Sequence, residues 1–133
     1  MAYVLTVLLA ISINCGSISN AGVPSTETGP AGTWTGESIC MVKDSPCHDE
    51  KVIYHITEPD ASGKLQIQAD KVVNGKAEGM GTLDCSFDKK SSAITCSMKN
   101  GLWEFSVNGN KIEGTLKHPD GSIFRRVNLT KGT

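Results

Sequence analysis

Apolar and polar residues alternate in short runs from residue 33 to residue 130. Successive side chains of a strand point to opposite faces, so this alternation is typical of strands that bury one face. No segment shows the sustained apolar period that marks an amphipathic helix. The pattern predicts eight strands, at Thr33–Val42, Lys51–Thr57, Lys64–Val73, Gly79–Phe87, Ala93–Met98, Leu102–Val107, Lys111–Lys117 and Ile123–Thr130.

Turn residues separate the predicted strands. Asn-Gly pairs occur at residues 74–75, 100–101 and 108–109, and connectors rich in Pro, Asp and Gly occupy residues 59–63 and 119–122. Asparagine and glycine tolerate the positive φ of tight hairpin turns, so we expect each strand to pair with its neighbour along the chain. Short strands at regular spacing predict an all-β protein, either a sandwich or an up-and-down barrel.

The turns also predict which strand residues face each other. Two-residue turns at residues 100–101 and 108–109 place Trp103 opposite Met98 and Phe105 opposite Ile112. A slip of one residue would turn this apolar set outward, so the pattern supports the register. One apolar face then spans three hairpins, and it consists of Leu83, Cys85, Phe87, Ile94, Cys96, Met98, Trp103, Phe105, Val107, Ile112 and Leu116.

Two regions are less regular. For the turn at residues 74–75 we favour a three-residue loop with a bulge, which places Leu83 opposite Ile67. In the second predicted strand, Ile53 lies on one face and Val52, Tyr54 and Ile56 lie on the other. The pattern leaves open which of these two faces is buried.

Four of the five cysteines form two close pairs. A four-residue loop at residues 89–92 places Cys85 opposite Cys96, and a short loop within residues 43–46 places Cys40 opposite Cys47. Directly opposed strand residues lie about 4.5–5.5 Å apart, which suits a disulfide. We therefore predict two hairpin disulfides and an oxidising, secreted or periplasmic location.

The N-terminal segment differs in composition from the rest of the chain. Residues 1–21 contain a short apolar core followed by small and polar residues, as in a signal peptide. Cleavage after Ala21 would make Gly22 the mature start; a buried strand and a lipid-anchored Cys15 are the alternatives. Residues 22–31 are predicted to be a flexible lead-in, and residues 32–133 a single, monomeric domain.

Charge and apolar length exclude several classes of partner. The formal net charge is -1 and the sequence pI is about 6.3, with no stripe of Lys or Arg. Nucleic acid and anionic membrane surfaces are therefore not expected as partners. The N-terminal apolar run is also too short to span a bilayer, which needs about 20 residues.

The sequence offers little chemistry for catalysis or metal binding. His48 and Glu50 share a strand face and could form half of a metal site with His118, but a solvated hairpin end is the preferred interpretation. No G-x-S-x-G motif occurs, and Asp84, Asp88 and Glu104 form no evident catalytic pair. We expect no enzyme activity, no metal and no cofactor.

Gly32-Thr33-Trp34 opens the first predicted strand, and Arg125-Arg126 lies in the last. Together with eight meandering strands, these residues resemble the lipocalin-like, or calycin, barrels. The resemblance implies an eight-stranded antiparallel up-and-down barrel, closed between the first and last strands. It also implies that Trp34 and Arg125 or Arg126 form a cation–π contact at the closed end.

These features lead to two functional expectations from different classes. The first is a lipocalin-like binding protein for a small, partly apolar ligand, contacted by Tyr54, Leu65, Ile67 and Trp103. The alternative is a barrel with a solid core that acts through loops, such as Lys43–Glu50 and Pro59–Gly63. Such a barrel would inhibit a protease or a lysozyme, or bind another secreted protein.

Overall fold

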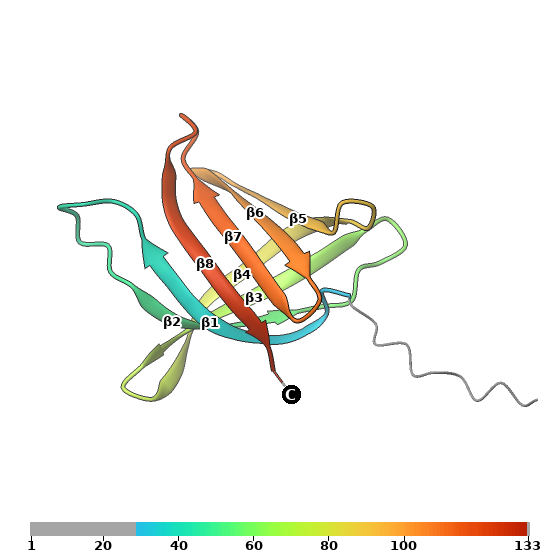
Figure 1. Cartoon of the computed structure of the whole chain (residues 1–133), viewed down its shortest axis with the longest axis horizontal. Coiled ribbons are helices and arrows are strands. Elements are labelled where there is room, and N and C mark those ends of the chain that lie inside the picture. The colour runs from blue at the N-terminus through green and yellow to red at the C-terminus, as the bar shows by residue number, and fades with distance from the viewer. Residues whose placement is uncertain (1–28, 133) are drawn as a thin grey trace, which may run out of the picture.

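A computed structural model of the chain describes residues 29–132, which form one closed antiparallel barrel (Figure 1). Each strand pairs with its neighbours along the chain, and the first strand also pairs with the last. This confirms the all-β, eight-stranded up-and-down barrel. Its strands are β1 (Gly32–Cys40), β2 (Glu50–Ile56), β3 (Lys64–Val73), β4 (Lys76–Asp88), β5 (Ala93–Met98), β6 (Gly101–Asn108), β7 (Lys111–Lys117) and β8 (Ile123–Lys131).

The expectations for residues 1–21, for Cys15 and for most of the lead-in lie outside the described residues. Residues 29–132 include no helix that could serve as a membrane span.

Both predicted disulfides are present. Cys85 and Cys96 join β4 to β5 with a Cα–Cα distance of 4.3 Å, and the pairing of Phe87 with Ile94 confirms the predicted register of this hairpin. Cys40 and Cys47 are joined with a Cα–Cα distance of 5.8 Å. Here β1 ends at Cys40, two residues earlier than predicted, and Cys47 lies in the loop between β1 and β2, so the two cysteines are not opposed strand residues.

The register of the next two hairpins differs from the prediction by two residues. Trp103 pairs with Cys96 and Leu116, and Phe105 pairs with Ile94 and Gly114. The turns consist of residues 99–100 and 109–110. In the second turn, Gly109 adopts a positive φ of 60°. A shift of two residues keeps every side chain on the same face, so the predicted apolar face survives the error.

The β3–β4 hairpin combines a tight turn with a bulge. Asn74 and Gly75 both have positive φ and form a two-residue turn, not the three-residue loop that we expected. Leu83 nevertheless faces Ile67, because the bulge lies further along the pair, where the register shifts next to Ala69. In β2 the face carrying Val52, Tyr54 and Ile56 is the buried one.

The two ends of the barrel are defined by the chain direction. We call residues 29–31, 57–63, 89–92 and 109–110 the closed end, and residues 41–49, 74–75, 99–100 and 118–122 the open end. In Figure 1 the 57–63 segment and the start of β1 lie on the right, while the β1–β2 loop and the β3–β4 hairpin project on the left. The core between them consists of Trp34, Val52, Tyr54, Ile56, Leu65, Ile67, Ala69, Cys85, Ile94, Cys96, Trp103, Phe105, Val107, Ile112, Val127 and Leu129.

Trp34 anchors the closed end, but its cationic neighbour is not the predicted one. The side chain is fully buried, and its Nε1 donates a hydrogen bond of 2.8 Å to the carbonyl of Pro30. The Nζ atom of Lys131 lies 5.5 Å from the ring centroid. The prediction of an arginine is wrong because β1 pairs Trp34 with Lys131 and Cys40 with Arg125. That register places Arg125 six residues, or roughly 20 Å, along the strand.

Candidate functional site

Exposed apolar side chains gather at the open end of the barrel. Two of them lie in the β1–β2 loop. One is the last residue of β3, one is the last residue of β5, and one lies early in β4 next to the bulge. Among residues 29–132, the exposed large hydrophobic residues are Met41, Val42, Val73, Met80 and Met98. We call these five residues the apolar rim. Exposed apolar side chains that gather at one end of a fold are candidates for a binding site.

The interior also changes in packing along the barrel axis. Near the closed end the inward-facing Trp34, Ile94 and Ile112 are almost completely buried. Towards the open end the inward-facing Leu83 and Leu116 are only half-buried, and Met98 is 45% exposed. Met98 therefore belongs to the rim and not to the core in which we predicted it. The barrel interior is tightly packed at the closed end and less tightly packed at the open end.

A row of inward-facing residues crosses the barrel just inside the open end. Cross-strand partners share a face, and the pairing runs from Cys96 to Trp103, Leu116, Arg125 and Cys40. Arg125 is thus an interior residue at the level of Trp103, and its side chain is only 14% exposed. A charged side chain this buried needs polar partners.

Partners of Arg125 come from β1 and β2. Its Nη1 atom lies 3.1 Å from the hydroxyl of Ser38 and 3.5 Å from the Ser38 carbonyl. The Glu50 carboxylate lies 3.7 Å from the same nitrogen. That distance makes an ion pair but is too long for a hydrogen bond. The guanidinium carbon also lies 5.6 Å from the centre of the Phe124 ring.

Tyr54 extends this polar cluster into the core. Burial raises the pKa of Tyr54 to about 12, while the nearby Arg125 acts to lower it and Glu50 to raise it. The ring packs edge-on against Phe105 at 6.2 Å, and Phe105 stacks on Trp103 at 5.1 Å. The three aromatic rings form a floor between the polar cluster and the packed end of the barrel.

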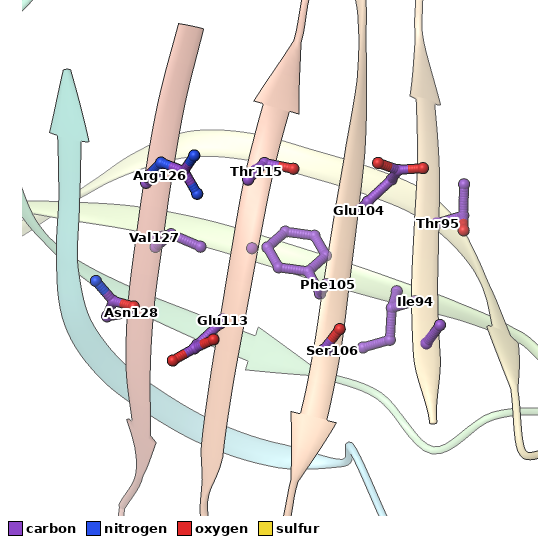
Figure 2. Close-up of a pocket in the computed structure, with 12 residues that line it drawn as sticks. Ile94, Thr95, Glu104, Phe105, Ser106, Glu113, Thr115, Arg126, Val127 and Asn128 are labelled. Atoms are coloured by element: carbon purple, nitrogen blue, oxygen red, sulfur yellow. The ribbon is translucent and has the colours of Figure 1, made fainter. Parts of the chain in front are cut away.

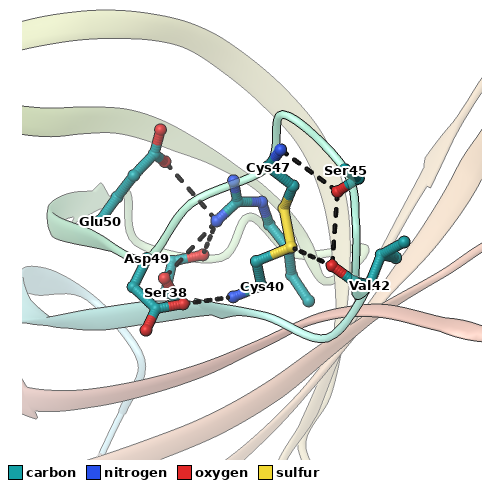
Figure 3. Close-up of a disulfide and its surroundings, with 8 residues drawn as sticks. Ser38, Cys40, Val42, Ser45, Cys47, Asp49 and Glu50 are labelled. Atoms are coloured by element: carbon teal, nitrogen blue, oxygen red, sulfur yellow. Dashed lines mark hydrogen bonds and ion pairs between the residues drawn. A yellow bond between two sulfur atoms is a disulfide. The ribbon is translucent and has the colours of Figure 1, made fainter.

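The β1–β2 loop is held in place beside the polar cluster. The Cys40–Cys47 disulfide spans the loop, and Figure 3 shows Asp49 and Glu50 on the return segment next to it. The Asp49 carboxylate accepts a 2.9 Å hydrogen bond from the backbone N–H of Cys40. These links fix the strand ends that carry Ser38 and Glu50, so the cluster is built on a constrained frame.

The predicted ligand-binding residues lie at two different levels. Tyr54 and Trp103 belong to the aromatic floor below the open end. Leu65 lies one residue from the start of β3, near the closed end, and Ile67 is fully buried opposite Ile56 and Leu83. All four side chains belong to the same buried core cluster, so they differ in position along the barrel and not in packing.

The sequence prediction missed Ser38, Lys71 and the inward position of Arg125. For the two cations, the alternation of the sequence does contain a signal. Arg125 lies two and four residues before the buried Val127 and Leu129, which places it on their face. Lys71 lies two residues after Ala69 and pairs with the buried Val52, so it also faces inward at the open end. Strict alternation along β3 and β8 would have revealed both cations.

A second concave region lies outside the barrel, on β5 to β8. It has a volume of about 570 Å³, and Figure 2 shows its polar side chains in rows across the four strands. One row contains Thr95, Glu104, Thr115 and Arg126. Glu104 is already paired with Lys117 at 2.7 Å. This outer groove has no exposed aromatic or large apolar side chain among its lining residues, so it lacks the features of the open end.

The two loops of the alternative hypothesis lie at opposite ends of the barrel. Residues 57–63 belong to the closed end and border a hollow of about 760 Å³ with Pro30 and Phe87. Hydrogen bonds from the hydroxyl of Ser62 and the backbone of Lys64 hold this loop and lower the pKa of Asp60. The other loop belongs to the open end. The two loops are therefore separate candidate contact surfaces.

A hydrogen-bonded chain on the outer surface has the residue types of a catalytic triad. The Thr33 hydroxyl lies 3.3 Å from Nδ1 of His55, whose Nε2 lies 3.2 Å from the Asp70 carboxylate. Thr33 pairs with His55 across β1 and β2, and Asp70 lies diagonally across from His55 in β3; none of the three lines the outer groove or the hollow beside residues 57–63. We interpret these hydrogen bonds as a cross-strand ladder that gives the carboxylate of the buried Asp70 a hydrogen-bond partner.

His48 and His118, which were suggested for a metal, lie in different loops of the open end. His118 packs against the Phe124 ring at 5.0 Å, in the loop before β8. Within residues 29–132 no group of three or more His, Cys, Asp or Glu side chains is arranged to hold a metal ion.

Comparison with known proteins gives no family for this chain. No family model matches the sequence, and no match was found among curated proteins.

Proposed function

We propose that this protein is an extracytoplasmic, lipocalin-like binding protein that takes a small, partly apolar ligand at its open end. The observation that carries the proposal is the apolar rim, which coincides with the end where the interior loosens. Two disulfides support a secreted or periplasmic location, because such bonds persist in oxidising compartments. Transfer of apolar ligand surface from water to the rim would drive binding.

The proposed ligand lies closer to the open end of the barrel than the sequence alone suggested. Leu65 lies near the closed end and Ile67 is completely buried, so neither is proposed as a ligand contact. The proposed contacts are Met98 and Val73 at the rim, with Trp103 and Tyr54 as the floor. A small ligand with an apolar body and a polar group fits this order of side chains.

Binding of an uncharged fluorescent probe tests this proposal. Disulfide-bonded protein titrated with N-phenylnaphthylamine is expected to show saturable enhancement of fluorescence at one site per chain. Met98→Glu should weaken the affinity about tenfold or more, because the probe would then desolvate a carboxylate. Thr82→Glu, an equal charge change on the outer face of β4, is the control and should leave the affinity unchanged. No saturable binding by the wild-type protein would reject the proposal.

One observation favours the alternative, a protein-binding module. The β1–β2 loop presents Met41 and Val42 on a frame fixed by the Cys40–Cys47 disulfide. Rigid, exposed apolar loops are common contact elements. Under this alternative, immobilised protein would retain a specific protease, lysozyme or other secreted protein, and Met41→Asp would abolish retention. The same variant would weaken N-phenylnaphthylamine binding only if the rim is a ligand site.

A further inference from the structure

The last strand of the barrel contains an acceptor motif for N-linked sugars. Asn128-Leu129-Thr130 has the form Asn-x-Thr, in which an oligosaccharide is attached to the asparagine amide. No other asparagine in the sequence has a serine or threonine two residues later. Such motifs are modified in chains that enter a secretory pathway, and the two disulfides support that route for this chain.

The register of β8 turns the acceptor residues away from the core. Val127 and Leu129, the two neighbours of Asn128, are only 1% and 3% exposed. Because successive side chains of a strand point to opposite faces, Asn128 and Thr130 point outward, and both are exposed. A shift of one residue would place the Asn128 amide in the core, away from any sugar. The packing of this strand therefore keeps the motif accessible in the folded barrel.

Open space lies beside the Asn128 side chain. Asn128 lines the outer groove of about 570 Å³, and Figure 2 shows it next to Glu113 at one edge of that groove. Its cross-strand neighbours are Glu113 in β7 and Glu37 in β1, which are both exposed. Their carboxylates are acceptors for the hydroxyl groups of a sugar. Among the residues that line the groove, no large apolar side chain is exposed, so a hydrophilic glycan suits this surface.

We propose that Asn128 carries an N-linked oligosaccharide, which covers part of the outer groove. The donor is an oligosaccharide on a polyprenyl diphosphate, and the host's oligosaccharyl transferase catalyses the transfer. Nδ2 of Asn128 bonds to the anomeric carbon of the sugar and loses one proton. The bond between that carbon and the diphosphate breaks, and the diphosphate leaves with the bonding electrons. This inference goes beyond the proposed function and shares with it only the extracytoplasmic location.

A glycan at this position would separate the wall of the barrel from its ends. N-linked glycans are bulky and hydrophilic, so this one would shield the outer face of β7 and β8 from protein contact. Asn128 lies three residues from Arg125 along β8, which corresponds to roughly 10 Å. The glycan would therefore project from the side of the barrel, and the open end would remain available to a ligand or a partner.

Secretion of residues 1–133 from cultured mammalian cells tests the proposal. Disulfide-bonded protein is purified from the medium, and its intact mass is measured before and after treatment with peptide-N-glycosidase. We expect the treated protein to lose the mass of a single glycan. The enzyme converts the modified asparagine to aspartate, so digestion in heavy-oxygen water followed by peptide mass spectrometry should place the label at Asn128.

Matched variants assign the glycan to the motif. Asn128→Gln and Thr130→Ala should each abolish the mass loss, whereas Thr130→Ser keeps the hydroxyl and should keep the glycan. Asn110→Gln is the control, because Asn110 is an exposed asparagine of the neighbouring turn with Ile112 two residues later. Its mass loss should equal that of the wild type. All these positions are exposed, so the variants are expected to fold.

The outcomes separate this inference from the extracytoplasmic location. If disulfide-bonded protein reaches the medium without a glycan, the glycosylation proposal is wrong and the location stands. A glycan that persists in Asn128→Gln would also overturn it, and so would a glycan found only on chains that lack the disulfides, because Asn128 would then not be accessible in the folded barrel. If no protein reaches the medium, the predicted location fails and this proposal fails with it.

Discussion

The closed and open ends of this barrel are made from the same eight strands but solve different physical problems. At the closed end, Trp34 is completely buried, bonded to Pro30 and covered by Lys131. At the open end, the corresponding inward positions are occupied by Cys40, Arg125 and Met98, which are charged, cross-linked or exposed. The closed end is sealed by packed groups, whereas the open end combines a disulfide with polar and exposed apolar groups.

Substitution of a glycine at the seam between β1 and β8 should lower stability far more than substitution of a glycine at the open end. A Cβ atom added at Gly36 would lie 1.8 Å from the backbone carbonyl oxygen of Asn128 in β8, so the strands could not pair as they do. Gly36→Ala should cost more than about 4 kcal/mol or prevent folding, as do other severe backbone clashes. At the open end, Gly79→Ala meets only an ordinary contact at 3.7 Å from Asp70 and should cost less than about 1 kcal/mol.

Urea unfolding followed by tryptophan fluorescence would measure both glycine variants. Similar stability of Gly36→Ala and Gly79→Ala would show that the β1–β8 seam is not closed as described.

The two disulfides should differ in stability and in access to reductant. Chain entropy alone predicts similar contributions, about 2.5 kcal/mol for Cys40–Cys47 and about 2.8 kcal/mol for Cys85–Cys96, because both loops are short. Burial separates them: Cys85 and Cys96 are core residues, while Cys40 and Cys47 are half-buried. Replacing Cys85 and Cys96 by serine should therefore cost more, because it also places two hydroxyls in the core.

Differential alkylation and mass spectrometry under mild reductant would follow both bonds in one sample. Cys40–Cys47 should be reduced first, and earlier reduction of Cys85–Cys96 would contradict the assignment of the packed core.

Tyr54 links the two ends, and its ionisation should destabilise the fold. Its pKa is raised to about 12 by burial, above the value of about 10 in an unfolded chain. The unfolded state therefore loses this proton first, so stability is fully present below about pH 10 and decreases up to about pH 12, by at most about 2–3 kcal/mol. Tyr54→Phe should flatten this decrease.

Denaturant unfolding of wild type and Tyr54→Phe across this pH range isolates the effect, since all other titrating groups are common to both proteins. Identical pH profiles would show that the Tyr54 hydroxyl is not buried in the native state.

The smallest expected effect concerns the cation at the closed end. Lys131 lies over the Trp34 ring, and its Nζ lies 3.3 Å from the carbonyl of Gly29. Lys131→Ala should cost about 0.5–1 kcal/mol, the size of an exposed cation–π contact, and Lys131→Arg should retain most of it. Arg126→Ala on the outer face is the matched control. A larger loss in Arg126→Ala than in Lys131→Ala would favour the arginine cap that the resemblance implied.

Much of the fold follows from alternation and turn residues, because these are local signals. They predicted β3, β5 and β7 to the residue, and both disulfides. They misplaced the turns after Met98 and Asn108, since a shift of two residues preserves each face and the pattern cannot detect it.

The site was less predictable because it depends on stagger between strands far apart in sequence. The closing cation was assigned to Arg125 or Arg126, yet the register of β1 with β8 places Lys131 there and moves Arg125 to the open end. No local pattern fixes that stagger. The apolar rim, likewise, exists only once Met41, Met80 and Met98 are brought to one end by the topology.

Chemical-shift mapping by NMR tests most directly whether the open end is the binding end. Titration of disulfide-bonded protein with N-phenylnaphthylamine is predicted to shift the amide signals of Ser38, Met98, Trp103 and Arg125. The signals of Trp34 and Ile112 at the closed end should remain unchanged. Shifts centred on the closed end, or on Glu104 and Thr115 in the outer groove, would contradict the account.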